Sequence, residues 1–307
     1  MTQDELKLLF KKEDQFPFYF EGIARIYERK HQPYSNPLPP IDFNEPFQQI
    51  PNKLYKYIDL NGGLSSITHG NIQFSDPLSF WKLEKLDDPT EFWFDKLYMD
   101  NDSLNQMNDI IVQEYPDYRQ LHKIEIFLFI LHNHVLNLTK RNKVLCLAKT
   151  YLNHELWKEN STGICIEYDT SLFVNNHLKF ETDKYKLIGN PILYVDKLVK
   201  YPIRINDDRW LSNLIFVKNT IPFSREDEYR ILFTELNYYP IQHIGRPKDR
   251  IKITGDMLLD KKTNPTIPLR PKFDLSFITK VYYKKTVQDE SKLLAKLEKL
   301  NIPWKKL

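Results

Sequence analysis

Glycine, cysteine and long apolar runs are all scarce in this sequence of 307 residues. Only 8 glycines occur against 19 prolines, which argues against a glycine-rich nucleotide-binding loop. The two cysteines, Cys146 and Cys165, stand among apolar residues and form no CxxC pair. The sequence therefore offers no cysteine-based zinc site, and it predicts two buried free thiols in a reducing compartment.

A strong charge of either sign is also missing. The chain carries 44 basic and 41 acidic residues, a net charge of +3, so overall charge does not indicate a nucleic-acid or membrane partner. The most apolar run, residues 124–131, is far shorter than the roughly 20 residues that a membrane-spanning helix needs. Residues 1–16 hold no long apolar core of the kind found in signal peptides. These absences predict a soluble, cytoplasmic protein with no membrane partner.

The first fifty residues differ in composition from the remainder. Apolar spacing predicts short helices over 2–12 and 19–31, and residues 32–46 then hold five of the chain's prolines. Such a proline density excludes a helix or a central strand and is typical of an extended connector. The predicted organisation is therefore an N-terminal helical extension and connector, 1–50, followed by a main domain, 51–307.

Short apolar runs in the main domain predict strands, and polar or glycine-containing segments separate them. Asn61-Gly62-Gly63, for example, is expected to end the first strand. Strands and helices mix without a regular βαβ rhythm, so the predicted class is α+β, with a mixed, mainly antiparallel sheet and flanking helices. The predicted strands are 53–59, 71–77, 144–148, 163–169, 191–195, 227–234 and, as the last, 278–283.

Helices are predicted between several of these strands. Residues 104–141 and 210–220 have helical spacing, and a helical turn containing Trp157 joins two of the strands. Thr286 and Asp289 are spaced as a capping box at the start of a final helix. The apolar stripe of that helix is Leu293, Leu294, Leu297 and Leu300.

The stretch FSREDEYRILF, residues 223–233, gathers carboxylates before an apolar run. Strand alternation places Glu226, Glu228 and Arg230 on one face and three apolar positions on the other. Carboxylates about 6.6 Å apart repel by roughly 2.5 kcal/mol at an effective dielectric near 20. Two interpretations stay open: a solvated strand face with a Glu228–Arg230 pair, or a carboxylate pair suited to a sugar oxocarbenium ion. The apolar positions are Tyr229, Ile231 and Phe233.

Several segments, in order, resemble a bacterial family known as domain of unknown function 2971, which has been linked to abortive phage infection. The resemblance implies a role in antiviral defence. It covers most of residues 53–285, with Asp87 where the family usually has Asn. The segments that carry it are KLYKYIDLNGGLSSITHGNIQFSDPLSF, DDPTEF, VLCLAKTYLNHELWKENSTGICIEYD, VKNTIPFSREDEYRILF and ITKVYYKK.

A strand beginning LYKY and a late strand opening with E-x-E also resemble the plan of ADP-ribosyltransferases. That resemblance implies NAD as cofactor, with Lys56 in the early NAD-binding position. It implies that Glu228 is the catalytic carboxylate that stabilises the ribosyl cation and that Glu226 orients the acceptor. The remaining predicted cofactor contacts are Tyr55, Tyr57 and Arg230.

The leading hypothesis is an antiphage effector that acts as an NAD-dependent ADP-ribosyltransferase on a macromolecular acceptor, either protein or nucleic acid. It requires Lys56, Tyr57 and Glu228 to share a cleft, with the first and the late strand side by side, and it assigns no metal ligands. One alternative is a non-catalytic module that binds a phage or nucleic-acid component through an aromatic and lysine-rich surface. Another is a metal-dependent nuclease built from the 226–228 cluster and from Asp87, Asp88 and Glu91.

Overall fold

The computed structural model describes residues 45–77, 96–98, 109, 113, 142–181, 183–195, 200–202, 214–220, 223–235, 268–287 and 289–307. The helices predicted over 2–12 and 19–31 lie outside the described residues, as does the stretch 104–141 apart from two helical positions, Asp109 and Gln113. Among the described helices, none has the length and apolar character needed to cross a membrane.

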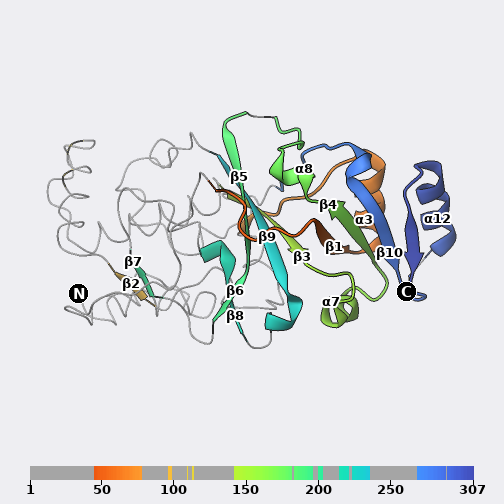
Figure 1. The fold of residues 1–307 in the computed structure, drawn as a ribbon, viewed down its shortest axis with the longest axis horizontal. Helices are drawn as coiled ribbons and strands as arrows, with labels where there is room; N and C mark the ends of the chain where they lie inside the picture. Colours follow the sequence, from red (N-terminus) through yellow and green to blue (C-terminus); the bar gives the residue numbers. More distant parts are fainter. Residues whose placement is uncertain are drawn as a thin grey trace, which may run out of the picture.

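A seven-stranded sheet is the main feature of the described residues, in the order β11-β10-β4-β1-β3-β9-β5 (Figure 1). All neighbouring strands pair antiparallel except β10 and β11, which are parallel. This arrangement confirms the predicted α+β class. The strands are β1 (Lys53–Ile58), β3 (Asn142–Ala148), β4 (Ile164–Asp169), β5 (Tyr185–Pro191), β9 (Glu228–Glu235), β10 (Ile278–Tyr283) and β11 (Trp304–Lys306).

Short elements complete the described structure. Two small parallel pairs join β2 (Lys96–Tyr98) to β7 (Lys200–Pro202) and β6 (Leu193–Val195) to β8 (Val217–Asn219). The α-helices are α3 (Leu60–His69), α7 (His154–Glu159), α8 (Ser171–Val174) and α12 (Glu290–Lys299). The 3-10 turns are η4 (Leu214–Phe216), η5 (Phe223–Glu226) and η7 (Leu275–Phe277).

Alternation along the strands gives the sheet two different faces. One face packs against α3, α8 and α12 in a large apolar core, which includes Ile67 and Leu293. The other face, called here the α7 face, carries two smaller clusters: an aromatic one that contains Trp157 of α7, Tyr57 and Tyr282, and a largely aliphatic one around Val144 and Leu232. The leucine stripe predicted for the final helix is thus the side of α12 that faces the larger core.

Backbone pairing between neighbouring strands of the sheet is shortest between β1 and β3. These strands share a single residue pair, Tyr55 with Ala148. Further along β3, Ser75 takes over as the partner of Val144, and the two residues exchange two backbone hydrogen bonds. The predicted strand over 71–77 is therefore present only as isolated bridges, of which this is one.

The first helix among the described residues, α3, begins earlier than the glycines suggested. Asp59 caps α3 by accepting a hydrogen bond from the amide of Gly62, so Asn61-Gly62-Gly63 starts the helix instead of interrupting the chain. Gly63 is needed for packing, because a Cβ there would lie 2.4 Å from Cδ1 of Ile164 on β4. Glycine in this stretch therefore permits close contact between the helix and the sheet.

The end of the chain also departs from the prediction. The capping box is wrong: Asp289 has a left-handed φ of 53° and makes no side-chain cap, and the Thr286 hydroxyl donates to the carbonyl of Ser161. The strand over 278–283 is not the last, because β11 follows α12. In the described part of 210–220, η4 and β8 replace the predicted helix.

Candidate functional site

The carboxylates of the 226–228 stretch come from two elements. Glu226 ends the turn η5, and Asp227 turns the chain with a left-handed φ of 47° before Glu228 opens β9. Only Glu228 and Arg230 therefore share the strand face predicted for all three polar residues. The apolar face is as predicted, with Tyr229, Ile231 and Phe233 in the large core.

Glu228 and Arg230 form a buried ion pair. Arg230 Nε lies 2.7 Å from Glu228 Oε1 and Nη2 lies 3.1 Å from Oε2, a two-point contact. Glu228 is 6% exposed and Arg230 is 1% exposed, and Arg230 Nη1 also donates to the carbonyl of Ile215 at 2.6 Å. The predicted pair is present, but the prediction that it lies on a solvated face is wrong.

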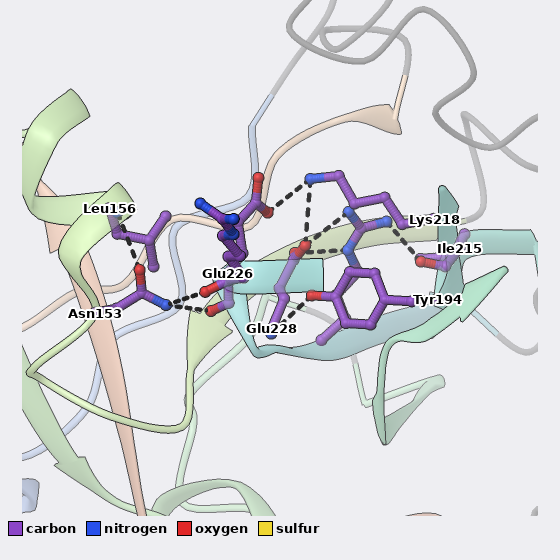
Figure 2. A network of polar contacts seen from close by, with 9 residues as sticks. Asn153, Leu156, Tyr194, Ile215, Lys218, Glu226 and Glu228 are labelled. Carbon is purple, nitrogen blue, oxygen red and sulfur yellow. Dashed lines mark hydrogen bonds and ion pairs between the residues drawn. The ribbon is translucent and has the colours of Figure 1, made fainter. Parts of the chain in front are cut away.

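Lys218 joins the two glutamates. Its Nζ lies 2.8 Å from Glu226 Oε2 and 3.6 Å from Glu228 Oε2, as Figure 2 shows. The Tyr194 hydroxyl accepts a hydrogen bond from the backbone amide of Glu228 at 3.0 Å. We call Glu226, Glu228, Lys218 and Arg230 the acidic network. It places two carboxylates and two cations together, so its formal charge is balanced.

The two carboxyl groups of the acidic network differ in proton affinity. Burial alone would raise the pKa of Glu228, but the adjacent Arg230 and Lys218 outweigh burial and lower that pKa to about 2. Burial raises the pKa of Glu226, and the opposing effect of Lys218 does not reverse this. Neighbouring carboxyl groups whose pKa values move apart are the arrangement expected of an acid–base pair.

Tyr55 and Tyr57 both lie on the α7 face and are mostly buried. The Tyr57 hydroxyl donates to the carbonyl of Thr150 at 3.0 Å and accepts from the amide of Asn153 at 3.1 Å. Its ring meets Trp157 edge-on, with centroids 5.1 Å apart. Tyr57 is thus a well-connected core residue, and burial raises the pKa of its hydroxyl.

Lys56 stands at the narrow junction between β1 and β3. Its Nζ donates to the carbonyl of Cys146 at 3.0 Å. That carbonyl belongs to the part of β3 where β1 is no longer its backbone partner. Lys56 therefore supplies a hydrogen bond that the sheet itself does not provide.

Strand β3 separates the opening strand from the acidic strand, so the expectation that they lie side by side is wrong. The registers nevertheless align Glu167, Tyr55, Ala148 and Glu228 in one row across four strands. Tyr55 and Glu228 therefore share the α7 face, with backbones about 10 Å apart for two strand spacings.

A short segment, residues 149–153, divides that face, and we call it the strap. On one side Asn153 Nδ2 donates to the carbonyls of Arg225 and Glu226, both at 2.8 Å (Figure 2). On the other side the strap bonds to Tyr57. Figure 1 shows β1 and β9 on either side of β3, from which the strap continues. The structure thus brings Glu226, Glu228 and Arg230 together and leaves Lys56 and the tyrosines outside their network.

A further buried carboxylate, Glu167, was not predicted from the sequence as a candidate site residue. It accepts from Lys53 Nζ at 2.5 Å, the Thr279 hydroxyl at 2.5 Å and the Tyr282 hydroxyl at 2.7 Å. Burial by itself would raise the pKa of Glu167, and these donors together lower it. The available signal was a carboxylate in the middle of the otherwise apolar stretch 164–168.

Metal ligation has little basis in the described part of the chain. No group of three or more His, Cys, Asp or Glu residues there is placed to hold a metal ion. The candidate nuclease residues Asp87, Asp88 and Glu91 lie outside the described residues. Cys146 and Cys165 are unpaired thiols, and burial raises the pKa of both.

Comparison with known proteins identified no matching family model, no matching curated protein and no matching solved structure. What is established is therefore the class: an α+β fold with a mostly antiparallel seven-stranded sheet that carries a buried acidic network.

Proposed function

We propose that this chain is an antiphage defence enzyme that breaks the nicotinamide glycosidic bond of NAD and transfers the ADP-ribosyl group to a macromolecular acceptor. The resemblance to the domain of unknown function 2971 family supports the defence role. One observation carries the chemistry: Glu226 and Glu228 both lie against the single ammonium group of Lys218, and their pKa values are shifted in opposite directions.

The reaction needs two different carboxyl groups. When the bond between ribose C1′ and nicotinamide breaks, the bonding electrons leave with nicotinamide and positive charge develops on the ribose. Glu228, which stays ionised, supplies fixed negative charge to that transition state. The acceptor then bonds to C1′ and loses a proton, which Glu226 accepts because its raised pKa gives it the greater proton affinity of the two.

The remaining members of the network hold these groups in place. Arg230 fixes both oxygens of Glu228, and Lys218 links the two carboxylates. Arg225 precedes Glu226 and is 80% exposed; its Nη1 lies 3.9 Å from Glu155 Oε1 in an ion pair, and its other donors face solvent, where a phosphate group of the substrate can bind. Lys56 already donates a hydrogen bond to the carbonyl of Cys146 on β3, so we assign it no role in binding NAD.

Nicotinamide release tests the proposal. Purified protein is incubated with NAD, with and without cell extract as a source of acceptor, and free nicotinamide is measured by chromatography. Replacing a carboxylate that handles the acceptor proton or the ribosyl charge is expected to slow release by at least about 100-fold. Glu226→Gln and Glu228→Gln are therefore both expected to show this loss.

The matched control is Glu298→Gln, which makes the same chemical change at an exposed position of α12. It is expected to leave release unchanged. Thermal melting of each variant separates loss of activity from loss of folding. Wild-type protein that releases no nicotinamide under either condition would falsify the proposal, as would a folded Glu226→Gln variant that is fully active.

A further inference from the structure

Lysine is concentrated at the C-terminal end of the described structure. Residues 284–307 contain seven lysines against three acidic side chains, an excess of four positive charges, whereas the whole chain has a net charge of +3. The remainder of the chain is therefore slightly negative. One end of a nearly neutral molecule thus presents a positive surface, which attracts anionic partners.

Aromatic rings lie beside two of these lysines. The Nζ atom of Lys305 is 5.8 Å from the centroid of the Tyr151 ring, and that of Lys284 is 5.2 Å from the ring of Trp157. Tyr151 stacks on Tyr282, with centroids 4.1 Å apart and 7° between the ring planes. Trp157 is buried and Tyr151 is partly exposed, so Tyr151 is the ring that a ligand can reach.

Two carboxylates on the neighbouring elements β4 and α12 already have partners of their own. Glu167 already accepts hydrogen bonds from Lys53 and two hydroxyls, and Glu290 is bonded to Lys306. Among the described residues, neither Lys284 nor Lys305 takes part in an ion pair. Their ammonium groups are therefore directed at aromatic rings and solvent.

We infer that Tyr151, Lys284 and Lys305, called here the Tyr151 surface, bind single-stranded nucleic acid. Proteins that bind single strands combine cations that follow the phosphates with aromatic rings on which unpaired bases stack. A duplex keeps its base faces stacked internally, and an acidic peptide offers no row of flat bases. The Tyr151 surface contains no residue of the acidic network, so this inference does not depend on the proposed function.

Binding is measured by fluorescence anisotropy with a fluorescein-labelled thymidine oligonucleotide, first at low salt and then in a salt titration. The double variant Lys284→Glu/Lys305→Glu is expected to bind at least about ten-fold more weakly and to show a shallower salt dependence. The matched control is Lys292→Glu/Lys299→Glu, which makes the same charge change on α12. The control is expected to retain most of the affinity.

Tyr151 separates base stacking from simple charge attraction. Tyr151→Ala is expected to weaken binding about ten-fold, because a stacking ring is lost, whereas Tyr151→Phe keeps the ring and the affinity. Thermal melting confirms that each variant is folded. The inference fails if wild-type protein does not bind at low salt, if the α12 control loses as much affinity as the surface variant, or if a duplex or polyglutamate binds as tightly as the single strand.

Discussion

Two carboxylates lie in the same row of the sheet and are held in different ways. Glu167 on β4 and Glu228 on β9 are both buried, and the pKa of each is lowered. Glu228 is bonded to the buried guanidinium of Arg230 and lies near Lys218. Glu167 accepts from two hydroxyl groups and from Lys53, whose side chain is 50% exposed.

The difference indicates how each site responds when a partner is lost. An ion pair in the interior balances two desolvated charges, so removing one partner leaves the other uncompensated. A carboxylate held by several donors, one of them a half-exposed lysine, retains its other hydrogen bonds when a single donor is removed. The acidic network should therefore be rigid and sensitive, and the surroundings of Glu167 more tolerant.

The largest expected effect comes from Arg230. Arg230→Met leaves Glu228 buried beside only Lys218 and is expected to reduce the free energy of unfolding by about 3 to 5 kcal/mol. Urea denaturation measures this loss. The double variant Arg230→Met/Glu228→Gln removes both charges and should recover much of the stability. A double variant as unstable as the single one would show that packing, not charge, dominates here.

Acid pH should weaken the stabilising contribution of Glu228. Glu228 has an ordinary pKa of 4.5 when unfolded and about 2 when folded. Its stabilising contribution is therefore complete above pH 4.5 and is lost as the pH falls toward 2. The stability difference between wild-type protein and Glu228→Gln, measured by urea denaturation, should shrink through this range. A difference that stays constant with pH would contradict the assigned pKa.

The smallest effects are expected around Glu167. Tyr282→Phe removes one hydroxyl donor and should cost about 2 kcal/mol, since the bond is to a charged group. Lys53→Met removes a half-exposed pair and should cost less than about 1 kcal/mol. Both are read from urea denaturation. If Lys53→Met were as damaging as Arg230→Met, the contrast between the two carboxylates would be lost.

Most of the long strands could be predicted from the sequence because their apolar runs are distinct, but the seven-residue β5 was missed, since the predicted segment 191–195 shares only Pro191 with it. The strands β1, β3, β4, β9 and β10 all match predicted segments within a few residues. Elements three residues long, such as β11 and β8, carry too little pattern to be recognised. Asn61-Gly62-Gly63 was misinterpreted because the need for close packing against Ile164 is a tertiary constraint.

The candidate site was also predictable only in part, because local patterns can be read from the sequence and contacts between elements cannot. The Glu228–Arg230 pair follows from alternation within one strand, whereas its burial depends on contacts with residues outside that strand, such as Ile215 and Lys218. Strand order is equally non-local, and nothing near β1 or β9 indicates that β3 lies between them. Glu167 was missed because its partners Lys53 and Tyr282 come from two other strands.

The single residue pair between β1 and β3 has a mechanical consequence. The sheet consists of two ribbons, β11-β10-β4-β1 and β3-β9-β5, whose backbones are joined at one point. Hydrogen bonds from the Lys56 side chain to β3 and between the Tyr57 hydroxyl and the strap add to this single backbone pair. The large apolar core spans both ribbons, so it holds together two halves of a sheet whose backbones would otherwise meet at a single residue pair.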